Sequence, residues 1–491
     1  MLKSFKPIGL VAVGAVIGVL LSLNLTAVAE KPASAQVALP LDDLRMLSDV
    51  FGKIKSDYVE PVDDKKLIKE AINGMVSGLD PHSQFLDQEA FRDLQVGTQG
   101  EFGGLGIEVG MEDGFVKVIS PIDDTPAFRA GIKAGDYIIK LDDAAVKGLS
   151  LNDAVKRMRG KPKTSIRLTI MRKGEDKPLV FNLTREVIKV HSVKVKTNEP
   201  GYATIRVAQF QEHTGEELVK AIQQAYKDNP DGLKGLVLDL RNDPGGLLNV
   251  AVAVSAAFLP KDDLVVYTDG RTEDSKMRLF ANRESYLRGT FRDDYIAKLP
   301  PTIKTVPMVV LVNQATASAS EIVAGALQDH KRAVVMGTQS FGKGSVQTIV
   351  PLNNNTAIKL TTARYFTPNG RSIQAKGITP DIVVEDPNLA AADRSLGIRE
   401  ADLEHHLINE DATPDGKSAA KPDGKPESKL APNAQTGAKG DSPAMPQAKP
   451  GDKDGEKAAP RNPRGDIDEK SDFQLTQALN HLKEMQVFTK R

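Results

Sequence analysis

Hydrophobic residues follow helical spacing in the first part of the chain. Apolar residues recur three or four positions apart in two stretches, Leu41 to Tyr58 and Leu67 to Gly78. This spacing places them on one face of a helix, so residues 36–97 are predicted to form a small helical region. Both stripes are interpreted as core or dimer contacts. The sequence Asp80-Pro81-His82-Ser83 is predicted to be a turn whose histidine has a structural role.

From Thr98 to Val187 the pattern changes to short runs of β-type residues around two short helices. The predicted strands are Ile107 to Val109, Phe115 to Ile119, Tyr137 to Leu141 and Ser165 to Ile170, and the predicted helices are Pro126 to Ala130 and Leu151 to Met158. Residues 98–187 are therefore predicted to form one domain.

Residues 188–386 alternate strand and helix signals, which predicts an α/β layered core. Gly235 to Leu240 and Met308 to Val312 are continuous apolar runs, typical of strands buried on both faces. Thr316 to Ile322 follows the second run and opens a predicted helix. A serine in such a turn is well placed to act as a nucleophile, because a helix N-terminus and free N–H groups stabilise developing negative charge.

The N-terminal segment, residues 1–35, has the pattern of a secretory signal peptide. Lys3 and Lys6 precede an apolar run from Ile8 to Leu23, and small residues permit cleavage before Glu30 or Gln36. We therefore expect an exported, periplasmic protein. The alternative is an uncleaved anchor in the inner membrane, although the run is shorter than the roughly 20 residues that span a bilayer.

The C-terminal segment divides into a polar stretch and a short helix. Residues 387–470 are predicted to be a low-complexity disordered linker, because Asp411 to Asp466 is rich in Pro, Gly and charged residues and contains no aromatic residue. Residues 471–491 recover a helical stripe of apolar residues: Leu475, Leu479, Leu482 and Met485. This helix is interpreted either as a contact with another subunit or an adaptor protein, or as a frayed end, because an isolated helix this short needs a partner.

Composition narrows the function classes. The 491 residues include 65 basic and 65 acidic side chains and no cysteine. Zero net charge gives no electrostatic reason to expect nucleic-acid binding. The lack of cysteine excludes disulfides, thiol catalysis and cysteine-ligated metal sites. No metal or organic cofactor is expected.

A serine nucleophile needs a base, and the histidines lie in no context typical of a Ser-His-Asp triad. A lysine acts as a base where an apolar site lowers its pKa. Lys343 lies between two glycines, close to the apolar Phe341. The alternative from the residues alone is that Ser318 and Ser320 cap the helix and that Lys343 is a solvated loop charge.

The lysine segment also matches part of a nucleotide-binding pattern. Gly337 to Lys343 satisfies Gly-x-x-x-x-Gly-Lys, but Gly344 stands where a phosphate loop needs Ser or Thr. Val346 to Leu352 is predicted to be a strand, whereas a phosphate loop opens a helix. ATP binding is therefore not expected.

The segment Gly104-Leu105-Gly106-Ile107 and the Gly, Pro and Ala positions after it resemble the circularly permuted PDZ domains of bacterial proteases. Glycines let backbone N–H groups converge on a carboxylate, and an edge strand from Ile107 can be extended by a peptide C-terminus. The resemblance implies that Gly104, Leu105, Gly106 and Ile107 bind protein substrates with apolar C-terminal tails. The alternative is an internal lock that binds no substrate.

Five motifs occur in the order found in the carboxyl-terminal processing peptidases, the tail-specific serine proteases of peptidase family S41, which this chain resembles from about Leu41 to Glu385. The motifs are Leu79 to Ser83, Gly103 to Ile107, Asp239 to Gly246, Thr316 to Ile322 and Phe341 to Gln347. The resemblance implies that Ser318 is the nucleophile, Lys343 the general base and Gln347 the residue that orients the lysine.

The same resemblance implies an oxyanion hole formed by backbone N–H groups of Ala319 and of Gly245 or Gly246, with the choice between the glycines left open. Ser320 remains the alternative to Ser318. In related enzymes, terminal helices pair subunits into a homo-oligomer or engage an adaptor.

The predicted fold class is multidomain α/β: a helical segment, a PDZ domain, a ClpP/crotonase-like α/β protease core and a disordered tail that ends in a short helix. The expected function is that of a serine endopeptidase with a Ser-Lys dyad, which processes or degrades extracytoplasmic proteins. Two alternatives stay open: a PDZ-bearing scaffold with an inactive protease domain, and a crotonase-like enzyme that acts on small thioesters.

Overall fold

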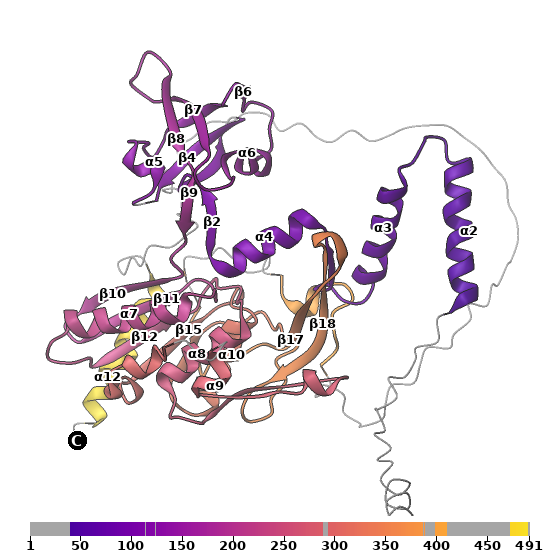
Figure 1. Ribbon diagram of the computed structural model, residues 1–491. Coiled ribbons are helices and arrows are strands. Elements are labelled where there is room, and N and C mark those ends of the chain that lie inside the picture. Colours follow the sequence, from indigo (N-terminus) through magenta and orange to yellow (C-terminus); the bar gives the residue numbers. More distant parts are fainter. Residues whose placement is uncertain are drawn as a thin grey trace, which may run out of the picture. The chain divides into compact units, whose positions relative to one another are not determined.

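The computed structural model describes residues 40–112, 114–122, 124–287, 293–385, 387, 398–409 and 472–489 (Figure 1). The chain divides into two compact units, Met1–Ile72 and Asn73–Arg491. The predicted signal segment and most of the predicted linker lie outside the described residues. Within the described ranges, no helix combines the length and the apolar character needed to cross a bilayer.

The first unit contains helix α2 (Leu41–Asp57) and the start of helix α3 (Asp64–Ser77), which confirms both helical stretches. Lys55 of α2 and Asp64 of α3 form an ion pair at 2.5 Å. Helix α2 has no buried residue, and its apolar stripe is exposed. Among the described residues, the stripe is therefore not part of a core, and its role as a dimer contact stays a prediction.

The segment predicted to be a PDZ domain forms an antiparallel sheet in the order β3-β4-β5-β7-β8, with β6 paired to β5. Its elements are β3 (Ile107–Glu112), β4 (Phe115–Pro121), α5 (Pro126–Arg129), β5 (Tyr137–Leu141), β6 (Ala144–Ala145), α6 (Leu151–Met158), β7 (Ser165–Met171) and β8 (Leu179–Thr184). Alternate strand residues and one face of α6 share an apolar core. Strands β2 (Glu101–Gly104) and β9 (Glu186–Lys189) pair at the two ends of this domain.

A six-stranded sheet forms the centre of the α/β region, in the order β10-β11-β12-β15-β16-β19. Strand β10 is antiparallel to β11, and all other neighbours are parallel. The strands are β10 (Val193–Glu199), β11 (Tyr202–Val207), β12 (Gly235–Asp239), β15 (Met308–Val312), β16 (Val334–Gly337) and β19 (Ile382–Val383). Every residue of β12 and β15 is buried, which confirms the interpretation of the two apolar runs.

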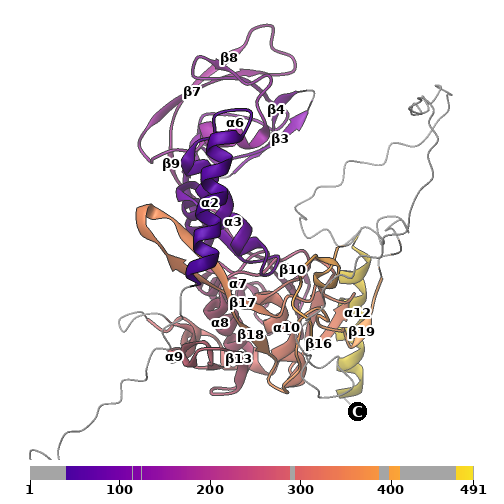
Figure 2. The same ribbon diagram turned by 90° about the vertical axis from the view of Figure 1, so that its right-hand side faces the viewer.

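Helices cover both faces of this sheet (Figure 2). One face packs against α7 (Thr214–Asp228), α8 (Leu248–Phe258) and α10 (Ala319–Asp329), and the other packs against α12 (Phe473–Thr489). Successive residues of β12 therefore point to different partners, with Leu236 and Leu238 on the first face and Val237 on the face of α12.

Helix α12 confirms the predicted C-terminal helix, and its partner is the chain's own sheet. Leu475, Leu479 and Leu482 are buried against strands β12, β15 and β16. The residue just before the helix also has a polar contact, because Arg241 Nη1 donates to Asp472 Oδ1 at 2.9 Å. Neither interpretation of the sequence, a contact with another protein or a frayed end, included this arrangement.

A second sheet has the order β1-β18-β13-β14, with β17 paired to β18 (Figure 1). Its strands are β1 (Gln84–Leu86), β13 (Leu264–Gly270), β14 (Arg278–Phe280), β17 (Ser345–Pro351) and β18 (Ala357–Phe366). The remaining helices are α4 (Gln88–Gln99), α9 (Arg283–Tyr286) and the 3₁₀ helices Glu273–Ser275, Ile296–Lys298, Pro301–Lys304, Asn353–Asn355 and Glu400–Asp402. Strand β17 begins two residues after Lys343, which confirms the strand predicted there, whereas a phosphate loop would open a helix.

Part of the predicted linker, residues 398–409, is folded. Glu400 and Asn409 are buried, and the Glu400 backbone N–H donates to the Phe341 carbonyl oxygen at 3.2 Å. The linker prediction for residues 387–470 is therefore wrong for these positions. The segment is held largely by polar contacts, which an analysis of apolar content does not detect.

Candidate active site

Ser318 lies in the turn between β15 and α10, with φ 54° and ψ −113°. This backbone conformation is unfavourable for a residue with a side chain and persists only where neighbouring contacts hold it. The Ser318 N–H donates to Glu321 Oε2 at 2.7 Å, and the adjacent Ala317 N–H donates to the Asp243 carbonyl oxygen at 2.9 Å. Ser318 is partly exposed. A strained, accessible serine at a helix N-terminus fits the position of a nucleophile.

The alternative serine, Ser320, has a different environment. It is fully buried, and its hydroxyl donates to the Asp243 carbonyl oxygen at 3.1 Å. Its hydroxyl therefore stabilises the turn and is withdrawn from solvent. The geometry favours Ser318 over Ser320 as the residue that meets a substrate.

Lys343 lies in the loop between β16 and β17. Burial lowers the pKa of its ammonium group from 10.5 to about 8, and the positive charge of Lys359 is the second cause. The carboxylates of Glu400, Glu321 and Asp80 act in the opposite direction. A larger fraction of Lys343 is therefore neutral near pH 8 than of a solvated lysine, which suits a general base.

The buried carboxylate of Glu321 connects the serine turn with the lysine loop. Its Oε2 accepts the N–H groups of Ser318 and Lys343, at 2.7 and 2.9 Å. Its Oε1 accepts the Ser340 hydroxyl at 2.6 Å and the Gly342 N–H at 2.7 Å. Burial raises the pKa of Glu321 to about 7, although the four donors oppose this rise. The backbones of Ser318 and Lys343 are thus both hydrogen-bonded to one side chain.

Tyr365 of β18 makes a second connection between the same segments. Its buried hydroxyl lies 3.1 Å from the Ser318 carbonyl oxygen and also contacts the Lys343 carbonyl oxygen. A phenol has a single proton, so one of the two carbonyl groups accepts it at a time. The tyrosine therefore restrains the backbones of Ser318 and Lys343 at their carbonyl groups, whereas Glu321 binds their N–H groups.

Gly245 and Gly246 follow β12 and lie against the serine turn. A Cβ atom on Gly245 would be 2.9 Å from Ser318 Cβ, and one on Gly246 would be 2.1 Å from the Phe210 carbonyl oxygen. Both positions also have positive φ, so they require glycine. The Gly245 N–H donates to Asp243 Oδ1 at 2.8 Å. In the described part of the chain, the N–H groups of Gly246 and Ala319 donate to no protein acceptor.

Asp243 supports this glycine turn from inside the protein. Its Oδ1 accepts the Gly245 N–H, while its buried Oδ2 has no hydrogen-bond partner. Burial raises the pKa of Asp243 to about 8. The carboxyl group is therefore largely protonated at neutral pH.

Gln347, expected to orient Lys343, instead points to other partners. Its amide nitrogen donates to Ser345 Oγ at 2.9 Å and to Thr361 Oγ1 at 3.3 Å. Across the described ranges, neither Gln347 nor the Ser318 hydroxyl forms a hydrogen bond with the Lys343 ammonium group. Catalytic hydrogen bonds often tighten only in the substrate complex.

The predicted peptide-binding residues lie where the PDZ sheet begins. Gly104 ends β2, and Ile107 opens β3, which is the edge strand of its sheet. Leu105 is buried in the domain core, and Gly106 has φ 74°. Among the described strands, β3 pairs only with β4, so its other edge has no neighbouring strand, as peptide binding by strand addition requires.

Three family models match successive parts of the chain. A model of the activating protease CtpB N-terminal domain matches residues 17–90, the PDZ domain model matches residues 103–183, and peptidase family S41 matches residues 201–384. The carboxy-terminal-processing protease of Bartonella bacilliformis is 47% identical over 410 residues, which are 82% of this chain and 90% of that protein. The chain belongs to the carboxy-terminal processing proteases of peptidase family S41.

Further relatives of this S41 protease agree. The carboxy-terminal processing protease CtpB of Bacillus subtilis is 35% identical over 380 residues, covering 76% of this chain and 74% of that protein. Among solved structures, the photosystem II D1 C-terminal processing protease is 29% identical, with a TM-score of 0.39, and the match covers 74% of this chain and 97% of that chain. The family models and the two curated relatives confirm the predicted family, the serine protease class and the combination of PDZ domain and S41 core.

Among the unpredicted residues at the site of this S41 protease, Tyr365 and Glu400 left no local signal in the sequence. Tyr365 lies in strand β18, where an aromatic residue is ordinary, so its contacts with Ser318 and Lys343 leave no local signal. Glu400 lies 16 residues after the end of the S41 match at residue 384, in a segment interpreted as linker. Only long-range contacts reveal either role.

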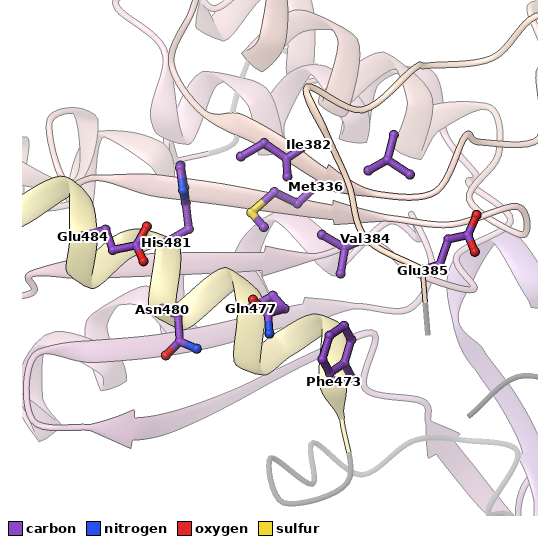
Figure 3. A pocket seen from close by; sticks show the side chains of 10 residues that line it. Met336, Ile382, Val384, Glu385, Phe473, Gln477, Asn480, His481 and Glu484 are labelled. Carbon is purple, nitrogen blue, oxygen red and sulfur yellow. The ribbon is translucent and has the colours of Figure 1, made fainter. Parts of the chain in front are cut away.

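A pocket elsewhere on the S41 core lies between α12 and the strands β16 and β19 (Figure 3). Phe473, Gln477 and His481 line it from the helix, and Met336 and Ile382 line it from the sheet. None of the candidate catalytic residues lines this pocket. It is separate from the candidate active site.

Proposed function

We propose that this protease cleaves peptide bonds with Ser318 as nucleophile and Lys343 as general base. The observation that carries the proposal is the Glu321 carboxylate, which holds the backbone of both residues, while burial lowers the pKa of Lys343 to about 8. Neutral Lys343 accepts the Ser318 proton as the serine oxygen attacks the substrate carbonyl carbon. The protonated lysine then donates a proton to the leaving amine, and water hydrolyses the acyl-enzyme.

The oxyanion of this reaction is proposed to bind the N–H groups of Gly246 and Ala319. Gly245 is less suited, because its N–H already donates to Asp243 Oδ1 at 2.8 Å. Gly246 and Ala319 flank the serine turn and have unused donors among the described residues. Donors fixed before the reaction stabilise the developing charge without reorganisation.

The substrates are proposed to be proteins with apolar C-terminal tails, which bind along β3 from Gly104 to Ile107. Support comes from the PDZ family match and from the free edge of β3. Gln347 is proposed to orient Lys343 once substrate is bound. The pattern of residues 1–35 further supports an exported protein with extracytoplasmic substrates.

The dyad is tested with residues 36–491 as wild type, Ser318→Ala, Lys343→Ala, Ser320→Ala and Lys376→Ala. Cleavage of an unfolded protein with an apolar C-terminus is followed on a gel, and thermal melting checks folding. We expect Ser318→Ala and Lys343→Ala to abolish cleavage. Lys376, whose side chain is exposed, is the control for Lys343 and should be dispensable. Cleavage by folded Ser318→Ala would refute the dyad.

A catalytically inactive scaffold is the second candidate function. It predicts that the wild type binds the apolar tail but does not cleave the protein. Binding of a fluorescent tail peptide, measured beside cleavage, separates the two. The charge environment of Lys343 favours the protease.

A further inference from the structure

Glu400 is a buried acid outside the S41 match, and both of its carboxylate oxygens have partners. Its Oε2 lies 2.7 Å from His82 Nε2, and its Oε1 accepts the Gln374 amide at 2.8 Å. Only 1% of its side chain is exposed. Burying a carboxylate is costly, so a site that keeps one with a full set of partners needs an explanation.

These contacts reach the loop of Lys343 from both sides. The Glu400 N–H donates to the Phe341 carbonyl oxygen at 3.2 Å, two residues before the lysine. Gln374, which Glu400 holds, accepts the Gly344 N–H at 3.0 Å, one residue after the lysine. Lys343 therefore lies between two backbone groups that Glu400 fixes, one directly and one through Gln374.

His82 ties Glu400 to the turn before β1. Asp80 Oδ1 accepts the His82 N–H at 2.8 Å and the Thr361 hydroxyl at 3.1 Å. Thr361 in turn accepts the Gln347 amide at 3.3 Å. The turn thus supports both Glu400 and the glutamine that is expected to orient the lysine.

We propose that Glu400, held by His82, is a positioning residue for Lys343, which fixes the lysine loop and places a negative charge beside the ammonium group. This inference rests on the proposed Ser318–Lys343 dyad. It assigns a role to the turn containing His82 and to the segment 398–409, which lies beyond the family match.

The negative charge of Glu400 changes the pKa of Lys343, which packing of an uncharged side chain in its place would not do. Lys343 is faced by Glu321 from α10, Lys359 and Tyr365 from β18, Asp80 from the turn before β1, and Glu400 from its 3₁₀ helix. Glu400 is the first of the acids that raise the pKa of Lys343 against burial and Lys359. Removing its charge therefore lowers the pKa of Lys343 further and favours the neutral amine.

The test compares wild type with Glu400→Gln, Glu400→Asp and Asp402→Asn in a peptide-cleavage assay from pH 6 to 10. In Glu400→Gln we expect the ascending limb of kcat/KM to move to lower pH by about half a unit. We also expect kcat on the plateau to fall about tenfold or more, with KM unchanged, because the base is less well placed. In Glu400→Asp the ascending limb of kcat/KM should stay at the wild-type pH, because aspartate keeps the negative charge. Asp402→Asn removes an exposed charge from the same 3₁₀ helix and should change neither quantity.

A Glu400→Gln enzyme with an unmoved limb and wild-type kcat overturns the inference. A lower kcat with an unmoved limb also overturns it, because loss of packing alone would produce that result. If Glu400→Gln does not fold, His82→Ala replaces it, and an unchanged kcat in His82→Ala then overturns the inference. Failure of the dyad is distinct, because Ser318→Ala or Lys343→Ala would then still cleave.

Discussion

The backbone N–H groups of Ser318 and Lys343 donate to the same atom, Glu321 Oε2, at 2.7 and 2.9 Å. The two residues come from different loops of the S41 core, so their separation depends on this shared acceptor. A side chain on the helix that follows Ser318 thereby holds the backbone of both members of the proposed dyad. The proposed dyad is preorganised through backbone contacts, independently of any hydrogen bond between the reactive atoms.

Glu321→Gln should lower kcat about 100-fold while the protein stays folded. A glutamine presents one oxygen and one NH₂ group, and the NH₂ group cannot accept the N–H bonds that one carboxylate oxygen now accepts. Steady-state cleavage and thermal melting check this expectation. Glu273→Gln, at an exposed position, is the matched control. An active Glu321→Gln enzyme would show that the dyad does not depend on the shared acceptor.

The rate of cleavage should rise with pH, with a midpoint near pH 8. Only neutral Lys343 accepts a proton, and its pKa is lowered to about 8 by burial and then by Lys359. Lys359→Gln removes the positive neighbour, so the pKa of Lys343 should rise. The ascending limb of the kcat/KM profile should then move to higher pH. The pH profile of kcat/KM measures both effects, and Lys376→Gln is the control. A limb that moves to lower pH in Lys359→Gln would contradict this account.

Asp243→Asn should remove a loss of stability that develops as the pH rises from 3.8 to about 8. The folded-state pKa of Asp243, about 8, is above its ordinary value of 3.8, so its contribution is complete below pH 3.8 and is lost as the pH rises toward 8. Asparagine keeps an oxygen for the Gly245 N–H and carries no charge. From pH 5 to pH 8, the free energy of unfolding of the variant should gain about 3.5 kcal/mol relative to wild type. Urea unfolding at both values measures this, with the exposed Asp176→Asn as control.

Leu482→Ala should lower the free energy of unfolding by about 3 kcal/mol, because Leu482 is fully buried between α12 and the central sheet. Asn480→Ala, on the exposed side of the same helix, should change it by less than about 0.5 kcal/mol. Urea unfolding compares the two variants. Equal stability of Leu482→Ala and wild type would mean that α12 leaves the sheet in solution.

Local signals in the sequence predicted much of this protein. The apolar runs of β12 and β15 and the turn at Ser318 depend on residues close together in the chain, so pattern and motif located them. The partner of α12 and the burial of Glu400 depend on contacts with residues far away in the sequence. Glu400 touches His82, 318 positions earlier. A polar segment without apolar periodicity leaves no local trace of such a contact.

Helix α12 has a consequence for how the protease is made. The helix is translated after every strand that it covers, and residues 410–471 separate it from the rest of the described core. Until it emerges from the ribosome, one apolar face of the central sheet has no cover, and Arg241 in the glycine-turn motif lacks its contact with Asp472. Synthesis of α12 therefore completes both the core and the surroundings of the glycine turn, so a chain that stops before α12 would be a defective enzyme.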